Sequence, residues 1–553
     1  MTSRAGIDHR PPTWVLLVAT GFLLGLAYPP NPVGLLGSIG LVPLLIASER
    51  ASSWKQLARW SYLSFLLFSA LSTWWVGSWQ AKTDTFLMIS CVLLIILHPI
   101  FFVVPLLLYR FVRRRLGLFA ALVFLPFLWC AGEYAHALGD ASYPWLTLGN
   151  TQTYNLYYIQ FIEFTGIWGA SFLLVIHNVV FTAMVFALGR SQGEQRTIFR
   201  LSTLILALTL VPPFLYGFYV MGEARNHFPE RVVTATIVQP NVDPWDKWKQ
   251  ADTTDHIRVN AELSHRAIDS GMRPDFFLWS ENAIPYPVTS PEYRERGRSL
   301  YREVDSLGVP VLTGFPDYRE YPGGSAPPSS KRLIRSRPDG TGDTVRWDYF
   351  NSSGLIIPRR GLVSAYHKMQ LVPFGERIPY VDAVPWLMSM LSWDVGISTW
   401  AKGDTIVVHR IPYRDSLRVG VAAVVCFESV YPDLVRRFVL NGAELLAVIT
   451  NDGWYLNTPG PLQHERFAAL RAIELRRSVI RSANTGISCA INPYGQILQE
   501  TGEDTMTTLT IPVELRSEMT LYARWGDWWP QSCLIATLIM IAIAWGRGRR
   551  GAR

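Results

Sequence analysis

The chain has 553 residues, too many for one ordinary globular core, so at least two domains are expected. Most of the net charge of +8 lies beside long apolar segments, which favours a membrane protein over a nucleic-acid-binding protein. The five cysteines contain no CxxC pair, which excludes a zinc site of that type and provides no disulfide framework.

Eight apolar segments are long enough, or nearly so, to cross a bilayer as helices. In chain order they are Trp14–Tyr28, Val33–Ala47, Ser61–Trp79, Thr85–Tyr109, Gly117–Tyr134, Thr165–Leu188, Ile198–Met221 and Ser532–Trp545, of which the first, second and eighth are short. The sequence therefore predicts three parts. Residues 1–222 form a transmembrane domain of seven spans, 223–528 form a water-exposed domain, and 529–553 form a last span with a basic tail.

Basic residues in the short loops predict the orientation of these spans. Arginine or lysine follows the second, fourth, sixth and eighth spans, whereas the loop 135–164 has neither. Because basic loops stay in the cytoplasm, one orientation satisfies every loop. Both termini are then cytoplasmic, and residues 223–528 lie on the outer side of the membrane.

Two histidines and a tryptophan cluster fall within the predicted spans. An ionisable group inside a span is a candidate functional residue, but no carboxylate accompanies His98 or His177 in a proton-relay pattern. We expect both histidines to be packed and hydrogen-bonded. Trp74, Trp75 and Trp79 are expected to form an interfacial belt rather than a ligand site.

Residues 223–528 alternate strand-like apolar runs with helical patterns, which predicts an α/β domain with helices covering its sheets. Strands or hairpins are expected at 231–243, 274–285, 309–318, 348–361, 417–429, 444–454 and 486–500. Helices are expected at 250–270, 291–307, 433–442 and Leu462–Ser482. The polar insertion 321–345 is expected to be flexible. No GxGxxG or Walker loop and no metal-spaced histidine pair occurs, so we expect neither a cofactor nor a metal.

Three polar residues follow predicted strands or lie in the loops beyond them. They are Glu281 in "FFLWSE", Lys368 in "YHKMQLVPFGERIPY" and Cys426 in "AAVVCFES". Taken singly, each has a simpler explanation, as a capping glutamate, a surface lysine and an inert buried thiol. Together they form a combination that is suited to acyl transfer through a thioester.

In that combination each group has a chemical role. Lys368 and the helix that begins near Tyr431 would favour the Cys426 thiolate. Glu281 would accept the thiol proton and return a proton to the leaving group. Lys368 and the backbone N–H of Phe427 would stabilise a tetrahedral oxyanion.

The same motifs resemble the carbon–nitrogen hydrolase, or nitrilase, superfamily. The matching pieces are "WSENAIP", "YHKMQLVPFGERIPY", "CFES" and the segment from "NDGWYLNTPG" to "INPYG", which cover most of residues 231–511. The resemblance implies an α-β-β-α sandwich with Glu281, Lys368 and Cys426 as its catalytic triad. Seven spans before such a domain and one after it resemble the apolipoprotein N-acyltransferase family, which then covers nearly the whole chain.

The resemblance also carries over supporting and substrate-binding residues. Glu376 and Glu428 match supporting glutamates, and Phe427 stands where the family often has tyrosine. The substrate-binding aromatics that it implies are Trp248, Trp454 and Tyr455, with Trp245 as a competitor for Trp248. The segment "AVPWLMSMLSW" (383–393) is unusually apolar, and Trp386 and Trp393 are expected to contact lipid in a lid. The alternative is a helix packed into the domain.

For the reaction, the resemblance implies a two-step transfer in a bacterial cytoplasmic (inner) membrane, with the catalytic domain on the periplasmic side. The acyl donor is a phospholipid, typically phosphatidylethanolamine, and the acceptor is the N-terminal diacylglyceryl cysteine of an apolipoprotein. No cofactor and no nucleic acid are implied. Two alternatives stay open at this point: a membrane-tethered amidase that acts on a small amide, and a transporter with an outer binding domain.

Overall fold

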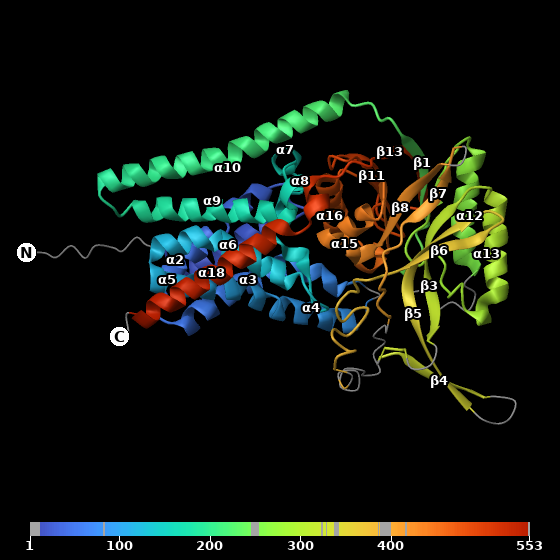
Figure 1. Ribbon diagram of the computed structural model, residues 1–553, viewed down its shortest axis with the longest axis horizontal. Helices are drawn as coiled ribbons and strands as arrows, with labels where there is room; N and C mark the ends of the chain where they lie inside the picture. The colour runs from blue at the N-terminus through green and yellow to red at the C-terminus, as the bar shows by residue number, and fades with distance from the viewer. Residues whose placement is uncertain are drawn as a thin grey trace, which may run out of the picture.

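The structure is a computed structural model. It describes residues 11–80, 83, 85–244, 254–321, 325–327, 329–336, 342–384, 386, 400–414 and 417–550. A helical bundle and a two-sheet sandwich lie side by side, and the described chain begins and ends at the end of the bundle remote from the sandwich (Figure 1). The chain enters the sandwich after a long helix and returns to the bundle as its last helix.

The bundle is built from the apolar segments of the N-terminal part and the last helix of the chain. Its main helices are α1 (Thr13–Ala27), α2 (Val42–Arg50), α3 (Trp54–Thr73), α4 (Thr85–Leu97), α5 (Pro99–Leu116), α6 (Leu118–His136), α9 (Ile167–Ala187), α10 (Gln192–Asn226) and α18 (Trp528–Arg550). Within the described residues, five helices are long and apolar enough to cross a membrane, with α4 and α5 counted as one. Short helices, including α7 (Leu156–Ile159) and α8 (Ile162–Thr165), connect α6 to α9.

Two of the predicted spans differ from one straight helix. Val33–Ala47 was predicted as a single span, but it consists of a 3-10 helix, Gly34–Ser38, followed by α2, which begins at Val42. Gly34 lies so close to the Thr151 carbonyl that a Cβ at this position would be 2.0 Å from its oxygen, so chain packing fixes the break. The segment Thr85–Tyr109 is divided into α4 and α5 at His98, where Pro99 has no N–H for the helical hydrogen-bond pattern, although His98 keeps helical dihedral angles.

The two histidines that the sequence placed within spans are buried and hydrogen-bonded, as predicted. His98 Nε2 lies 3.4 Å from the Tyr143 carbonyl oxygen. His177 contacts the hydroxyls of Ser38 and Thr209, each at 3.1 Å. Both therefore serve the packing of the bundle, which accounts for them without a proton relay.

The sandwich contains two facing sheets. The first has seven strands in the order β13-β1-β2-β3-β5-β4, with β6 paired to β5. Its strands are β1 (Val232–Gln239), β2 (Phe276–Leu278), β3 (Val311–Tyr321), β4 (Lys331–Ser336), β5 (Gly342–Ile357), β6 (Gly361–His367) and β13 (Thr507–Glu514). The second has six strands in the order β12-β11-β10-β9-β8-β7. They are β7 (His409–Tyr413), β8 (Leu417–Val425), β9 (Leu445–Thr450), β10 (Ser478–Ala483), β11 (Cys489–Ile491) and β12 (Ile497–Glu500).

Helices cover the outer face of each sheet, which gives the predicted α-β-β-α order. α12 (Thr254–Asp269) and α13 (Arg294–Leu307) cover the first sheet at the far side of the molecule. α15 (Pro432–Leu440) and α16 (Pro459–Leu475) cover the second sheet and face the bundle, where α17 (Leu521–Trp525) leads into α18 (Figure 1). Strands β8, β9 and β10 are buried along nearly their whole length, as expected for parallel strands covered on both faces.

Three predictions for this domain were wrong or incomplete. Leu462–Ser482 was predicted as one helix, but α16 ends at Leu475 and β10 begins at Ser478. The turn between them is made by Arg476, whose φ of 47° is left-handed. The insertion 321–345 was predicted as flexible, but its described part forms a hairpin in which β4 pairs with β5. The strands β7 and β13 were not predicted.

Buried polar contacts join the bundle to the sandwich. Arg476 donates to Glu163 Oε2 at 2.8 Å and to Gln160 Oε1 at 2.7 Å, and its guanidinium lies 5.1 Å from the centre of the Tyr494 ring. The side chains of Arg476 and Glu163 are 8% and 13% exposed. Removing one member of such a pair leaves a buried charge without its partner, so this contact holds the two parts in a fixed relation.

The Arg476→Met variant is expected to lose roughly 3–5 kcal/mol of stability, because Glu163 stays buried without its partner. The matched control is Arg298→Met, which breaks an exposed pair with Glu295 and should cost at most about 1 kcal/mol. Thermal unfolding of the two purified variants, in the same detergent, measures the difference. Equal and small shifts in melting temperature would show that the interface does not depend on Arg476.

Candidate active site

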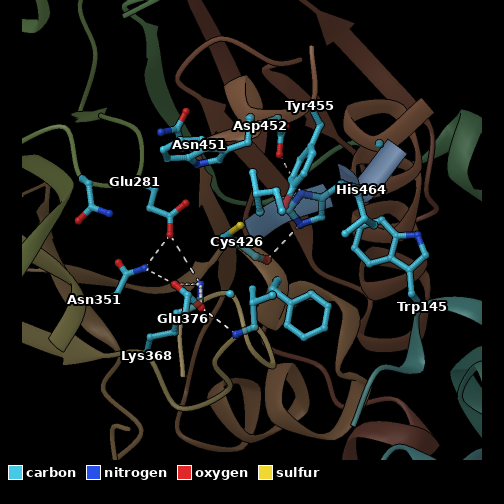
Figure 2. A pocket seen from close by; sticks show the side chains of 18 of the residues that line it. Trp145, Glu281, Asn351, Lys368, Glu376, Cys426, Asn451, Asp452, Tyr455 and His464 are labelled. Atoms are coloured by element: carbon cyan, nitrogen blue, oxygen red, sulfur yellow. Dashed lines mark hydrogen bonds and ion pairs between the residues drawn. The ribbon is translucent and has the colours of Figure 1, made fainter. Parts of the chain in front are cut away.

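A cavity of about 550 Å³ lies at the junction of the bundle and the sandwich (Figure 2). Both parts of the chain line it. The sandwich contributes Glu281, Asn282, Asn351, Lys368, Val372, Gly375, Glu376, Trp400, Cys426, Phe427, Asn451, Asp452, Trp454, Tyr455, Gly460 and His464, and the bundle contributes Trp75, Val76, Leu87, Tyr143 and Trp145. The three residues that the sequence singled out, Glu281, Lys368 and Cys426, therefore share one cavity.

Cys426 stands at the point where the buried strand β8 ends. Its φ is +53°, a left-handed conformation that is uncommon for residues other than glycine, and a 3-10 helix, Cys426–Val430, begins there. The seven residues from Val419 to Val425 are buried, whereas Cys426 is partly exposed to the cavity. The sharp turn thus presents the thiol at the end of a rigid strand.

Lys368 is held between two carboxylates. Its Nζ lies 2.9 Å from both oxygens of Glu376 and 3.6 Å from Glu281 Oε1, and the residue is 1% exposed. Asn351 Nδ2 donates to Glu281 at 2.7 Å and to Glu376 at 2.9 Å, which fixes the two carboxylates relative to each other (Figure 2). Burial alone disfavours the ammonium, but Glu376 and Glu281 outweigh it, and the pKa of Lys368 is raised. Lys368 is therefore a permanent cation.

The Cys426 thiol is not a resting thiolate. Burial and the negative charge of Glu281 raise the pKa of Cys426, and the opposing effect of Lys368 is smaller. Lys368 does lower the pKa of Cys426, in the expected direction, but burial and Glu281 outweigh this effect, and the contribution of a helix N-terminus stays a prediction. A neutral thiol requires a base when it reacts, and Glu281 is the carboxylate whose charge acts most strongly on it.

Glu428, two residues after Cys426, lies behind the cavity and not in its lining. It is fully buried and accepts hydrogen bonds from the Tyr366 hydroxyl at 2.7 Å, Met369 N at 2.6 Å and Val425 N at 3.0 Å. These donors come from the end of β6, the loop after Lys368 and the end of β8. Glu428 therefore ties the lysine loop to the cysteine turn and sets the positions of both.

A second polar cluster lies on the other side of Cys426 and was not singled out by the sequence. His464 of α16 approaches the Cys426 carbonyl oxygen at 3.1 Å, the Ser429 hydroxyl at 2.9 Å and Asp452 Oδ1 at 3.1 Å. Arg481 donates to the other oxygen of Asp452 and, with His464, holds the pKa of that carboxyl below its usual range despite burial. This cluster supports the backbone of the cysteine turn.

The wall of the cavity towards the bundle is aromatic. The ring of Phe427 stacks near Tyr143 and Trp145, with ring centres 5.6 and 6.3 Å apart. Trp75 lies 5.0 Å from Tyr455, edge to face. The indole N–H groups of Trp75 and Trp145 both donate to Gln463 Oε1, at 3.1 and 2.7 Å.

The assignment of Trp75 to an interfacial belt was therefore wrong. Trp75 is buried in the cavity wall, whereas Trp74 and Trp79 are exposed. Of the predicted substrate-binding aromatics, Trp454 and Tyr455 line the cavity. Trp386 is 59% exposed and is not among the lining residues. Trp245, Trp248, Trp393 and most of the proposed lid at 383–393 lie outside the described residues.

The cavity residues that the sequence did not single out are Asn351, Asp452, His464, Tyr143 and Trp145, and Trp75 was named only as part of an interfacial belt. Asp452 lies two residues after the strand β9, so the strand-end rule that found Cys426 could have found it too. The other four lie inside elements or in a loop between spans, with no local signal. Among the described residues no group of three or more His, Cys, Asp or Glu side chains is arranged to hold a metal.

Sequence comparisons identify the family. A model described as the N-terminal domain of apolipoprotein N-acyltransferase matches residues 20–180, and a carbon–nitrogen hydrolase model matches residues 325–521. The apolipoprotein N-acyltransferase of Chlorobaculum tepidum is 34% identical over 537 residues, which cover 97% of this chain and 97% of that protein. The chain belongs to the apolipoprotein N-acyltransferase family. The enzyme of the same name from Geobacter metallireducens is 28% identical and covers 97% of this chain and 95% of that protein.

Solved structures also match the chain. A carbon–nitrogen hydrolase from Helicobacter pylori G27 has a TM-score of 0.36 and 15% identity, covering 54% of this chain and 94% of that chain. An amidase from Nesterenkonia sp. has a TM-score of 0.35 and 15% identity, covering 54% and 96%. The assignment of the sandwich to the nitrilase-like fold rests on the carbon–nitrogen hydrolase match and on its two-sheet topology.

A raised thiol pKa predicts how Cys426 reacts with iodoacetamide. Alkylation of the Cys426-containing peptide, followed by mass spectrometry, should be slow at neutral pH and accelerate only in the alkaline range. Glu281→Gln removes the carboxylate charge that raises this pKa, so the profile should move down by roughly one pH unit. Glu295→Gln, an exposed glutamate on α13, is the matched control and should leave the profile in place. A profile that stays unchanged in Glu281→Gln would contradict the electrostatic account.

Proposed function

We propose that the protein transfers an acyl chain from a phospholipid to the N-terminal cysteine of apolipoproteins, through a thioester on Cys426. The observation that carries this proposal is the shared cavity: Glu281, Lys368 and Cys426 face an aromatic wall supplied by the membrane-type bundle. A lipid ester approaching along that wall reaches the thiol directly. Family membership supports the same reaction class.

In the first step, the Cys426 Sγ attacks the ester carbonyl while its proton passes to Glu281. The negative charge on the carbonyl oxygen is stabilised by Lys368 Nζ and the backbone N–H of Phe427. The C–O bond then breaks, Glu281 returns the proton to the leaving alkoxide, and a lysophospholipid departs. Cys426 is left as a thioester, and Glu281 is again a carboxylate.

In the second step, the α-amine of the diacylglyceryl cysteine attacks the thioester carbonyl and loses a proton to Glu281. The C–S bond breaks, and the Cys426 sulfur recovers that proton. Glu376 is a positioning residue in this scheme, because it contacts Lys368 and accepts a hydrogen bond from Val372 N at 2.8 Å. The donor is proposed to be phosphatidylethanolamine, which the resemblance implies.

Two alternative functions fit the structure less well. An amidase with this triad would resolve the thioester with water, and it would need neither the bundle nor the aromatic wall of Tyr143 and Trp145. A transporter would be expected to carry its substrate site inside the bundle. The 550 Å³ cavity instead lies where the bundle meets the sandwich.

The decisive experiment follows the acyl group. Purified protein incubated with phosphatidylethanolamine vesicles should gain the mass of one acyl chain on the peptide that contains Cys426, and a diacylglyceryl-cysteine peptide should then remove it. Cys426→Ser should give no transfer to the peptide, whereas Cys489→Ser, which alters a buried thiol outside the cavity, should transfer normally. Transfer by Cys426→Ser would rule out the mechanism, and loss of the adduct to water alone would indicate a hydrolase.

We also propose that the bundle spans a bacterial inner membrane eight times, with residues 223–528 in the periplasm and both termini in the cytoplasm. The basic residues that support this proposal cluster at α5 and α18, where the chain leaves the bundle away from the sandwich. The domain boundaries near 222 and 528 are supported by the end of α10 at Asn226 and the start of α18 at Trp528.

Labelling of cysteines introduced at exposed positions tests this orientation, because the natural cysteines other than Cys426 are buried. In a Cys426→Ser background, a membrane-impermeant maleimide added to spheroplasts should label Arg302→Cys on the exposed surface of α13. Gln192→Cys, exposed at the start of α10, should react only after the membrane is permeabilised. The reverse pattern, or equal labelling of both before permeabilisation, would contradict the proposed topology.

A further inference from the structure

A second cavity, of about 220 Å³, lies in the bundle far from the candidate active site. It is lined by Ser48, Glu49, Leu57, Tyr109, Arg110, Arg113 and Arg114. These residues belong to the end of α2, the first turns of α3 and the last turns of α5. Figure 1 shows α2 and α5 at the end of the bundle remote from the sandwich. At ~30 Å³ per water, the cavity has room for several waters or one phosphate-sized group.

The lining of this cavity is strongly basic. Arg110, Arg113 and Arg114 have the i, i+3 and i+4 spacing that places side chains on one face of α5. Glu49 is the only acidic residue among the lining residues, and it is already engaged by Arg113 Nη2 at 3.0 Å and by the Tyr109 hydroxyl at 3.1 Å. Arg110 and Arg114 therefore leave about two positive charges uncompensated within the lining.

Arg110 carries an unused donor. The residue is 8% exposed, and its Nη1 donates to the Ala51 carbonyl oxygen at 2.9 Å. Its Nε is buried and has no hydrogen-bond partner among the described residues. A buried, charged donor without an acceptor is costly, and buried donors in proteins are nearly always satisfied. Because Arg110 lines the cavity, an external acceptor that enters it contacts this side chain.

Trp54 at the start of α3 holds two of the arginines in place. The guanidinium carbons of Arg110 and Arg114 lie 5.6 and 5.2 Å from the centre of the Trp54 ring, within the range of cation–π contacts. Packing against the indole restricts both side chains at the cavity. A guanidinium that is already oriented loses less freedom when it binds a phosphate.

General rules explain part of this arrangement but not all of it. Cations are favoured in the last turn of a helix, and basic residues are favoured on the cytoplasmic side of a membrane. The first rule is satisfied by an exposed side chain such as Arg115 in the last turn of α5, and the second by exposed side chains such as Arg196 and Arg200 near the start of α10. Neither rule requires a basic cavity whose lining includes a side chain as buried as Arg110.

We propose that this cavity binds the phosphate group of an anionic phospholipid at the membrane surface opposite the catalytic domain. Planar guanidinium groups pair well with phosphate oxygens, and basic pockets between membrane helices on the cytoplasmic side suit lipid headgroups. The proposal rests on the bundle spanning a membrane and is independent of the acyl-transfer step. Inorganic phosphate shares the chemistry and is the alternative source of the ligand.

The test uses the full-length protein in nanodiscs of phosphatidylcholine, with or without phosphatidylglycerol, or with inorganic phosphate added. Native mass spectrometry counts retained phosphatidylglycerol, and thermal unfolding measures stabilisation.

Arg110→Gln/Arg114→Gln should weaken retention by roughly tenfold or more, since charge-assisted hydrogen bonds are lost. Arg196→Gln/Arg200→Gln removes the same charge from the same side and should retain the lipid as the unmodified protein does. If the first double variant does not fold, Arg114→Glu, a change at an exposed side chain, decides the outcome.

The outcomes separate the sources of the ligand. Stabilisation and retention with phosphatidylglycerol alone support a lipid headgroup, and equal stabilisation by inorganic phosphate supports a free anion in the same site. Equal losses in the two double variants would show a general charge effect and overturn the proposal. Retention that is unchanged in Arg110→Gln/Arg114→Gln, or in Arg114→Glu, would overturn it too. Acyl transfer by these variants, measured in parallel, shows whether the candidate active site is intact.

Discussion

The interaction on which the site depends is the buried ammonium of Lys368 between Glu281 and Glu376. An ammonium that is 1% exposed is strongly disfavoured by burial unless carboxylates stand close to it. That requirement brings together the loop after β2 and the loop after β6, which are remote in sequence. Asn351, from the central part of β5, bridges the two carboxylates and keeps them from moving apart.

The same charge balance sets the state of the thiol. Lys368 favours the thiolate, but burial and the negative charge of Glu281 outweigh it, so the pKa of Cys426 is raised. The thiol is therefore unreactive until a base acts on it in the presence of an ester. Glu428 and His464 hold the turn at Cys426 from two sides, so that the positive φ of this residue is maintained by its surroundings.

How much the sequence could predict depended on where each residue lies in its element. The α/β class followed from alternating apolar strands and helices, whereas the α-β-β-α order came from the family resemblance. Glu281 and Cys426 were found because they follow predicted strands. Asn351 could not be found, since it lies inside β5, where an asparagine resembles any exposed strand residue. The helix predicted at Leu462–Ser482 was too long at its C-terminal end. The observed helix stops where Arg476 adopts a left-handed conformation, and no glycine or proline marks this position in the sequence.

The loop 135–164, which has no lysine or arginine, shows why a single sequence feature can have two causes. Its lack of lysine and arginine was used as a topology signal, yet residues 142–153 are buried between the bundle and the sandwich. Tyr143 and Trp145 from this loop stack against Phe427, next to Cys426. A lysine or arginine here would lie unpaired in the cavity wall, so packing excludes it in either orientation. The orientation therefore rests on the loops that do carry arginine. This loop instead belongs to the site, because its Tyr143 and Trp145 form part of the apolar cavity wall beside the Cys426 thiol.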